Sequence, residues 1–328
     1  MSLLTELALL FRVRRQMFRN NATHLTKEKI LRFVLLGGIG IVFFVLDYLF
    51  FHRIISYIAK IDVLDMVEVG TLLVARLLSM IFLMFFSMLV FSNVITSLST
   101  LYLSSDLGLL LSSPIRFASV FTVKFVETTL NSSMILLIFG LPVFIVCGQQ
   151  YQASWVYYAA IPLMLIPFII IPATLGTILT MSLVRFFPVK RVQQVLAVFG
   201  IILAAGLVIL FRFLRPEQLI SDIGMNQLLR YISQNRIPSA PYLPSTWAAE
   251  VLMSLLEGQG ATALLNLLWL VLAAGSIYVL ALLVARAIYY AGWTETSESR
   301  TVKTMKRGIL TERLLRRLPF LHPTTRSL

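Results

Sequence analysis

The sequence contains one cysteine, Cys147, and three histidines, His24, His52 and His322, which lie far apart along the chain. A single cysteine excludes an internal disulfide framework and a metal site built from several cysteines. The wide separation of the histidines argues against a histidine-ligated metal centre. We therefore expect no disulfide-stabilised fold, no bound metal and no other cofactor.

Charged residues are also scarce, at 13% of the chain, whereas 58% of the residues are hydrophobic. A soluble domain usually has about 25% charged residues. Too little polar surface remains to cover a water-soluble globule, which indicates that lipid is the solvent. The net charge of +13 would suggest a nucleic-acid partner for a soluble protein. Here the basic residues flank hydrophobic runs, which indicates orientation in a membrane and no nucleic-acid binding.

Signatures of catalysis and of nucleotide binding are missing as well. The chain has no G-x-x-x-x-G-K-[ST], no H-E-x-x-H and no G-x-S-x-G. Without the first of these motifs, the chain cannot hold a nucleotide phosphate in a P-loop. Gly37, Gly38 and Gly40 lie inside an apolar run with no following lysine, and we interpret them as a face for close helix packing. We expect a protein that is not an enzyme.

What the sequence does contain is long apolar stretches. A membrane span needs about 20 mostly apolar residues, and six stretches qualify: about 33–58, 69–98, 117–147, 154–184, 193–214 and 261–290. The fold class predicted is all-α, a polytopic bundle of about six membrane helices. Three regions follow: an amphipathic elbow segment at 1–32, a transmembrane domain at 33–290 with an external loop at about 215–260, and a basic tail at 291–328.

Basic residues alternate between successive connections. Several basic residues precede the first stretch, and the tail has more, from Arg300 to Arg326. Between them, the second connection has Arg116, and the fourth has Arg185, Lys190 and Arg191. The third connection has no charge, and Lys60 in the first is outnumbered by acidic residues. By the positive-inside rule, both termini lie in the cytosol.

The N-terminal residues form an amphipathic pattern. Their positive charges follow the apolar residues, the reverse of a signal peptide. The pattern indicates a helix lying in the membrane interface, with a frayed cytosolic helix as the alternative. The apolar side has Leu3, Leu4, Leu7, Leu10 and Phe11, and the other side has Thr5, Glu6, Arg12, Arg15 and Gln16.

The external loop has two amphipathic stretches, neither long enough to span. The first contains apolar residues from Leu219 to Ile232. In the second, Ser245 is placed to cap a helix that Gly258 would stop. We expect both to lie flat on the outer leaflet or to cover the bundle. The apolar face of the second would be Trp247, Val251, Leu252, Leu255 and Leu256.

The second cytosolic connection, Leu101 to Ile115, predicts a short helix. Ser104 or Ser105 can cap it, Asp106 suits its positively polarised first turn, and Pro114 stops it. Such a helix could dock into a groove of a partner protein. The alternative is a simple interfacial turn.

Several ionisable residues lie inside the predicted spans, where they cost about 2.5–3.5 kcal/mol each. Asp47 and Arg76 lie at similar depths on adjacent spans, and we predict that they form an ion pair that sets helix register, with a gating role as the alternative. Lys124, Glu127 and Asn131 form a polar ridge with Thr128 and Ser132 on the third span. We expect this ridge to pack between helices rather than to line a cavity.

Two segments carry a family resemblance. The run from Leu101 to Ile115, with Phe121-Thr122-Val123-Lys124-Phe125, resembles the cytosolic coupling segment of the permease subunits of ATP-binding-cassette exporters. The stretch Pro241-Tyr242-Leu243-Pro244-Ser245-Thr246-Trp247-Ala248-Ala249 resembles bacterial exporter permeases with an elbow helix and six-span halves, which tend to have a Pro-Ser-x-Trp run before the sixth span.

The resemblance implies a transmembrane subunit that binds a separate ATPase and exports a substrate. The elbow would be Met1 to Asn20, the coupling helix Ser104 to Ser113, and a second contact Arg185 to Val192. Such permeases often have a second membrane half, so we expect this chain to pair with another copy or a partner half, or to be truncated. The implied docking residues are Ser104, Ser105, Asp106, Leu107, Leu110, Pro114, Arg185, Lys190 and Arg191.

The resemblance also implies a location in the bacterial inner membrane. Three other functions are alternatives to export. A lipid-modifying membrane enzyme is disfavoured, because few histidines and acidic residues lie within the spans. An ion-coupled secondary transporter usually has internal repeats and acidic residues at the bilayer midplane, and neither is evident here. A membrane scaffold without transport activity stays open.

Overall fold

The computed structural model describes residues 27–64, 67–104, 106–187 and 242–287. It also describes single residues near the N-terminus and between 191 and 205. Most of the predicted span at 193–214 lies outside the described residues, as do the first amphipathic stretch of the external loop and the tail at 291–328.

All regular elements in the described ranges are helical, which confirms the all-α membrane bundle. Within the described residues, five helices are long and apolar enough to cross a membrane. They match five of the six predicted stretches, and most of the sixth lies outside the described residues. The elements are α2 (Lys27–Leu64), α3 (Val67–Leu98), the π-helix η1 (Ser99–Leu103), α4 (Leu107–Ser112), α5 (Phe117–Gln150), α6 (Trp155–Phe186), α10 (Pro244–Leu256) and a final helix at Gly260–Ala287.

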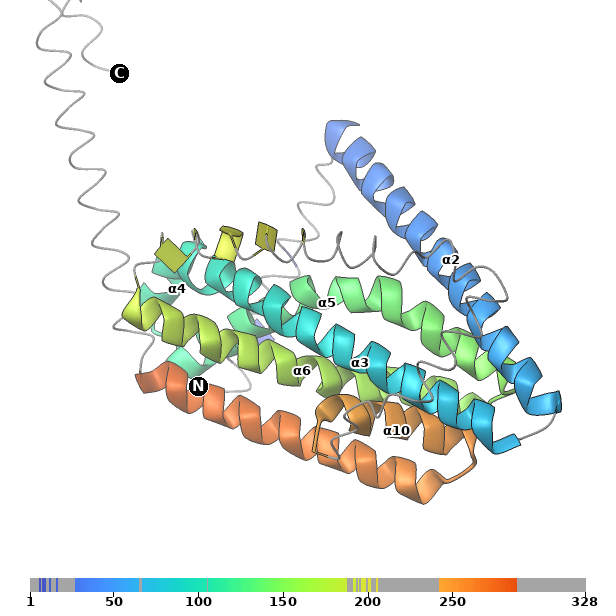
Figure 1. Cartoon of the computed structure of the whole chain (residues 1–328). Helices are drawn as coiled ribbons and strands as arrows, with labels where there is room; N and C mark the ends of the chain where they lie inside the picture. The colour runs from blue at the N-terminus through green and yellow to red at the C-terminus, as the bar shows by residue number, and fades with distance from the viewer. Residues whose placement is uncertain are drawn as a thin grey trace, which may run out of the picture.

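The bundle is built around α3, α5 and α6, which run side by side (Figure 1). One end carries α4, and we call it the α4 end. The other carries the short connection between α5 and α6, and we call it the turn end. Near the turn end, Phe82 of α3 stacks on Phe144 of α5 with ring centroids 4.9 Å apart, and meets Phe168 of α6 edge-on at 5.1 Å. Aromatic pairs of this kind add about 0.5–1.5 kcal/mol each beyond the burial of their area.

Helix α10 does not lie flat on a membrane surface; it packs into the bundle. It contacts α3 and α6, and its residues Ala248, Val251 and Leu252 belong to the same core as Phe82. Of the two predicted placements, covering the bundle is the one found. The predicted Ser245 cap is wrong, because the helix begins one residue earlier with proline in its first turn, and Ser245 is buried. Gly258 does end the helix, with a φ of 76°.

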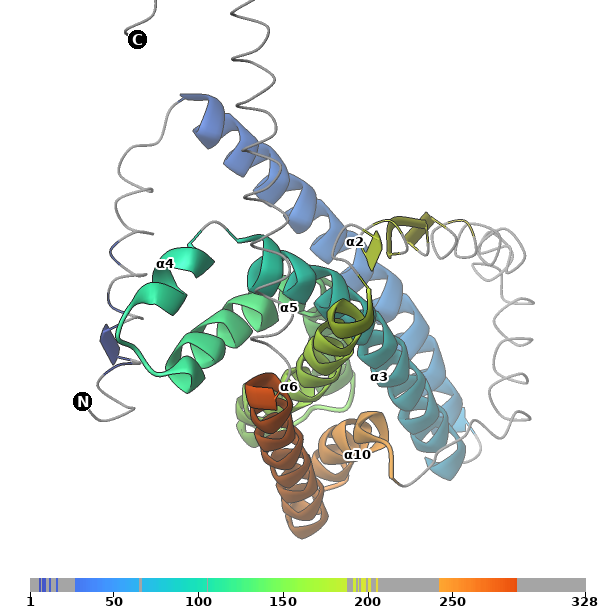
Figure 2. The same cartoon turned by 90° about the vertical axis from the view of Figure 1, so that its left-hand side faces the viewer.

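Helix α2 leans away from the other helices toward its N-terminal end (Figures 1 and 2). Its contacts with the bundle concentrate near the turn end, where Tyr48 donates a hydrogen bond to Gln149 at 2.6 Å. The predicted glycine packing face is absent from the described part of the chain. A Cβ at Gly37 or Gly38 would meet nothing within 4 Å, and one at Gly40 would touch only Ile138 at 3.9 Å.

Candidate functional site

The α4 end is built by a break in α3. The helix widens into the π-helix Ser99–Leu103, and the chain then passes through Ser104 to the six-residue α4. A π-helical turn inserts an extra residue per turn and is frequent at functional sites. Figure 2 shows α4 beside the beginning of α5 and set apart from the end of α6. A helix is therefore present at the predicted position, but it is shorter than the predicted Ser104–Ser113.

The two sides of α4 differ in burial. Leu107 is 2% exposed and packs in a core with Tyr102, Phe121 and Phe125, so its side chain faces the bundle and its docking role stays a prediction. Leu110 is half-buried and Pro114 is exposed. The outward apolar side chain is Leu109, which is 74% exposed and was not among the predicted docking residues. The predicted capping role of Ser104 is also wrong, because Asp106 occupies the N-cap position and no side chain caps the helix; the side chain of Ser105 lies outside the described residues.

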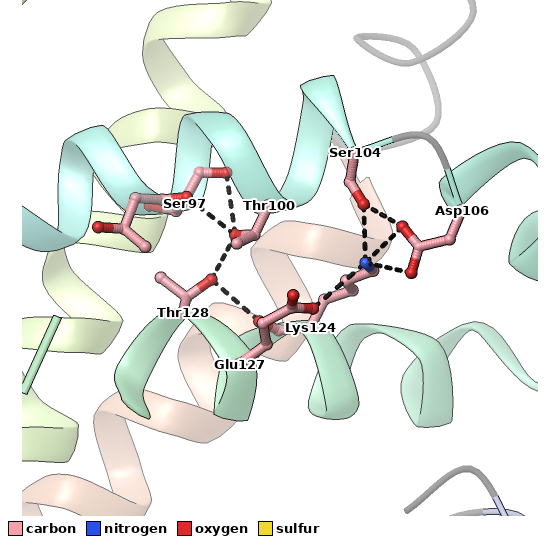
Figure 3. Close-up of polar contacts among 8 residues, drawn as sticks. Ser97, Thr100, Ser104, Asp106, Lys124, Glu127 and Thr128 are labelled. Carbon is pink, nitrogen blue, oxygen red and sulfur yellow. Dashed lines mark hydrogen bonds and ion pairs between the residues drawn. The ribbon is translucent and has the colours of Figure 1, made fainter. Parts of the chain in front are cut away.

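Ser104 and Asp106 instead bind Lys124 of α5 (Figure 3). The Lys124 ammonium donates to Oδ1 and Oδ2 of Asp106, both at 2.7 Å, and to Oγ of Ser104 at 2.9 Å. It also lies 3.3 Å from Oε2 of Glu127, one turn along α5. Ser104 donates a further hydrogen bond to Asp106. We call these four residues the lysine cluster.

The lysine cluster holds a buried cation. Lys124 is 1% exposed, and an ammonium buried without partners would be strongly unfavourable. Its donors are satisfied by two carboxylates and a hydroxyl, so the charge can stay in place. The segment before α4 is thereby attached to α5. Asp106 is consequently engaged within the chain, and its docking role stays a prediction.

Asp106 has a shifted pKa. Its partial burial raises the pKa, but hydrogen bonds from Lys124 and Ser104 and the positive charge of Lys124 lower it by more, so the net pKa lies below the ordinary value of 3.8. A carboxylate with a lowered folded-state pKa stabilises the fold above its unfolded pKa and loses this contribution as pH falls through the folded pKa.

We therefore expect the stability gap between wild type and Asp106→Asn to be constant from neutral pH to about pH 5 and to close below about pH 4. The measurement is the temperature at which half of the detergent-solubilised protein leaves the monodisperse peak, at each pH. A gap of the same size at acidic pH would contradict the ionic role of Asp106.

A buried polar seam continues from the lysine cluster between α3, α5 and α6. Thr128 of α5 donates to the Lys124 carbonyl at 2.9 Å and shares a hydrogen bond with Thr100 of η1, which continues α3. Ser97 of α3 hydrogen-bonds Thr180 of α6 at 3.1 Å. Farther along, Ser132 of α5 donates to Asn93 of α3 at 2.7 Å. These bonds agree with the expected packing of the ridge between helices.

Asn131 is the exception in the predicted ridge. Its side chain is exposed, so it does not belong to the seam. On an α-helix, positions 124, 128 and 132 share one face at a spacing of four residues. Position 131 lies about 60° to one side of that face, because each residue turns the helix by about 100°. The seam follows the four-residue spacing and leaves Asn131 outside.

Glu6, one of the few described residues near the N-terminus, contacts the beginning of α5, just after α4. Glu6, predicted on the water-facing side, is 8% exposed. Its Oε2 accepts hydrogen bonds from Oγ of Ser119 at 2.8 Å and from the backbone N–H of Arg116 at 3.3 Å. The bond from Ser119 lowers the pKa of Glu6, against a smaller effect of burial. An acidic group at a helix N-terminus is stabilised by the free N–H groups there. Sequence reasoning missed this contact, because the partners lie 113 positions apart.

The predicted pair of Asp47 and Arg76 is not formed among the described residues. Oδ2 of Asp47 is buried without a hydrogen-bond partner there, and the ion pairs of this part of the chain do not join it to Arg76. The adjacent Tyr48 donates its hydrogen bond to Gln149 at the end of α5. Similar depth on two helices therefore did not place the two side chains face to face.

The second predicted contact region lies at the same end of the bundle. Arg185 and Arg191 are exposed, and Lys190 lies outside the described residues. The neighbouring Val184 and Val192 share a core with Leu107. The α4 end thus presents Leu109 together with two exposed arginines, Arg185 in the last turn of α6 and Arg191 just after that helix.

Comparison with known proteins places the chain in a family. The family described as "Putative ATP-binding cassette" matches residues 24–328. The chain belongs to this ATP-binding-cassette family. No curated protein and no solved structure matches it. The match covers all five described spans and the α4 end, so the family is represented here by a membrane-helix bundle.

Proposed function

We propose that the chain is the transmembrane permease subunit of an ATP-binding-cassette exporter, and that a separate ATPase subunit binds α4 and moves the permease through this helix. The observation that carries the proposal is the way α4 is attached to the bundle. Leu109 projects outward, while Leu107 and the lysine cluster fix the same short segment to the bundle. A force applied at Leu109 is therefore passed to α5.

The family and the sequence support this division of labour. The family is named for an ATP-binding cassette, yet the chain has no P-loop motif and its described ranges form helices suited to a membrane. ATP hydrolysis is thus assigned to a partner chain. Closure of that partner on nucleotide would shift α4 and bias the bundle between two states.

The distribution of basic residues supports the orientation. Arg116, Arg185 and Arg191 all lie at the α4 end, and the connection between α5 and α6 at the turn end has no charge. By the positive-inside rule the α4 end faces the cytosol, where an ATPase would meet it. We assign the protein to the bacterial inner membrane, paired with a second copy or a partner half.

The test is capture of the tagged full-length chain in mild detergent, with mass spectrometry of the proteins that come with it. Wild type is expected to bring down an ATP-binding-cassette ATPase. Leu109→Glu is expected to lose it severalfold, because a charge replaces the apolar tip of α4, while the permease stays folded. Tyr242→Glu is the matched control: this side chain is 75% exposed, lies just before α10 and not at the α4 end, and should leave capture unchanged.

Two outcomes would contradict the proposal. An ATPase retained equally by both variants would remove the docking role of α4. The absence of any ATPase from folded, monodisperse wild type would remove the permease assignment and favour an ion-coupled transporter or a scaffold. Neither alternative is supported by a particular contact among the described residues.

A further inference from the structure

A groove of about 500 Å³ lies between α5, α6 and the Gly260–Ala287 helix. Buried residues form its floor: Phe125, Pro167 and Ala274. Exposed residues such as Ile166 and Val271 form its rim. The volume lies within the range of about 300–1,000 Å³ that is usual for small-molecule sites.

The lining is apolar apart from two hydroxyl groups that bind each other. Oγ1 of Thr122 and the hydroxyl of Tyr278 are 2.8 Å apart, and Thr122 also donates to the Ala118 carbonyl. Neither hydroxyl therefore needs a ligand to complete its hydrogen bonding. A charged or strongly polar ligand would lose its water in this groove without gaining partners.

The surroundings of the groove indicate what fills it. All of its lining residues lie in three helices suited to cross a membrane, so its open side meets bilayer hydrocarbon. We propose that the groove binds one hydrocarbon chain of a membrane lipid or another amphiphile. This inference does not depend on the ATPase partner or on export.

A helix of another protein fits the groove less well than a hydrocarbon chain does. The lining covers residues 122–126, 163–170 and 271–278, about two turns or fewer of each helix. A helix is about 10 Å wide with its side chains, and needs a longer strip to bury its apolar face. A single extended chain is narrow enough for a short groove.

The test uses the full-length protein in lipid nanodiscs that contain a trace of phosphatidylcholine with a diazirine on one acyl chain. After illumination, mass spectrometry locates the cross-links. Ile166 and Val271 are expected to be labelled severalfold more than Leu46 and Leu49 of α2, which are equally exposed apolar residues outside the groove. If a single hydrocarbon chain is recognised, excess unlabelled fatty acid should reduce the groove labelling. If the headgroup is also needed, only excess unlabelled phospholipid should reduce it.

Gly275→Phe should abolish this excess labelling, because a side chain there has room to fill the groove. Leu272→Phe is the matched control on the same helix; it is exposed, does not line the groove and should change nothing. Equal labelling of groove and α2 in wild type would overturn the proposal, even if Gly275→Phe failed to fold. Cross-linking of two Gly275→Cys chains to each other through this face would also overturn it, in favour of a second copy.

Discussion

Replacing Lys124 with methionine is expected to lower the free energy of unfolding by about 1–3 kcal/mol. Removing one partner of a buried ion pair usually costs about 3–5 kcal/mol, because the remaining charge is left uncompensated. The smaller figure applies here because the side chain of Asp106 is 56% exposed and can regain water. Glu127 is more buried and would lose its cation. The measurement is the half-loss temperature of the monodisperse peak in detergent.

A double-mutant cycle separates the ion pair from the loss of packing. Asp106→Asn, Lys124→Met and the double variant are compared, and a coupling of about 0.5–3 kcal/mol is expected for groups in direct contact. Arg286→Met is the control, since Arg286 is an exposed cation near the end of the Gly260–Ala287 helix. Additive losses in the cycle would show that Lys124 and Asp106 do not act together.

The same variants test the proposed transmission through α4. Lys124→Met keeps Leu109 at the surface, so the ATPase should still be captured. The rate of ATP hydrolysis by the captured ATPase should change less on binding this variant than on binding wild type, because the segment before α4 is no longer held to α5. Loss of capture in Lys124→Met, with folded protein, would mean that the lysine cluster shapes the docking surface itself.

Gly176→Ala is expected to destabilise the protein by about 1–3 kcal/mol, and Gly176→Leu to prevent folding. A Cβ at this position would lie 2.7 Å from Cβ of Asn93, 2.9 Å from the Val90 carbonyl oxygen and 3.0 Å from the Val94 nitrogen. Two of these atoms belong to the α3 backbone, so relief requires α3 and α6 to move apart. The bond that Thr180 donates to the Val94 carbonyl at 3.0 Å would be strained at the same time.

Gly37→Ala is the control for helix propensity. Gly37 lies inside α2, where an added Cβ meets nothing within 4 Å. Alanine there should be neutral or stabilising by up to about 1 kcal/mol, because glycine is a poor helix former. Equal effects of alanine at both positions, measured as the shift in half-loss temperature, would contradict a close contact of α3 and α6 at Gly176.

The predictions for Lys124 and Gly176 concern helices that are joined to one another. The polar seam and the close approach at Gly176 join α3, α5 and α6, and the lysine cluster joins these three helices to α4. Interhelical hydrogen bonds in membrane proteins contribute about 0.6–2 kcal/mol each. Helix α2 leans away from these helices (Figure 2). A displacement of α4 should therefore move the three joined helices together.

Position and length of the membrane helices followed from the sequence by itself. Apolar runs such as 117–147 and 154–184 correspond to α5 and α6, because the bilayer sets the length of a span and every backbone group in it must be bonded within the helix. The short helix at the α4 end and the stop at Gly258 were also predicted, because both depend on neighbouring residues alone.

The tertiary structure decided which side chains meet. A helix of six residues is too short for its apolar face to be read from spacing, so the inward Leu107 and the outward Leu109 could not be told apart. Local sequence does not show that Asp106 binds Lys124, and similar depth predicts a pair of Asp47 with Arg76 that the structure does not form. The contact of Glu6 with Ser119 had no signal in the local sequence. Spans are determined locally by the solvent around them, whereas ion pairs and docking faces depend on how helices rotate and lean against each other, which the packing of the whole bundle sets.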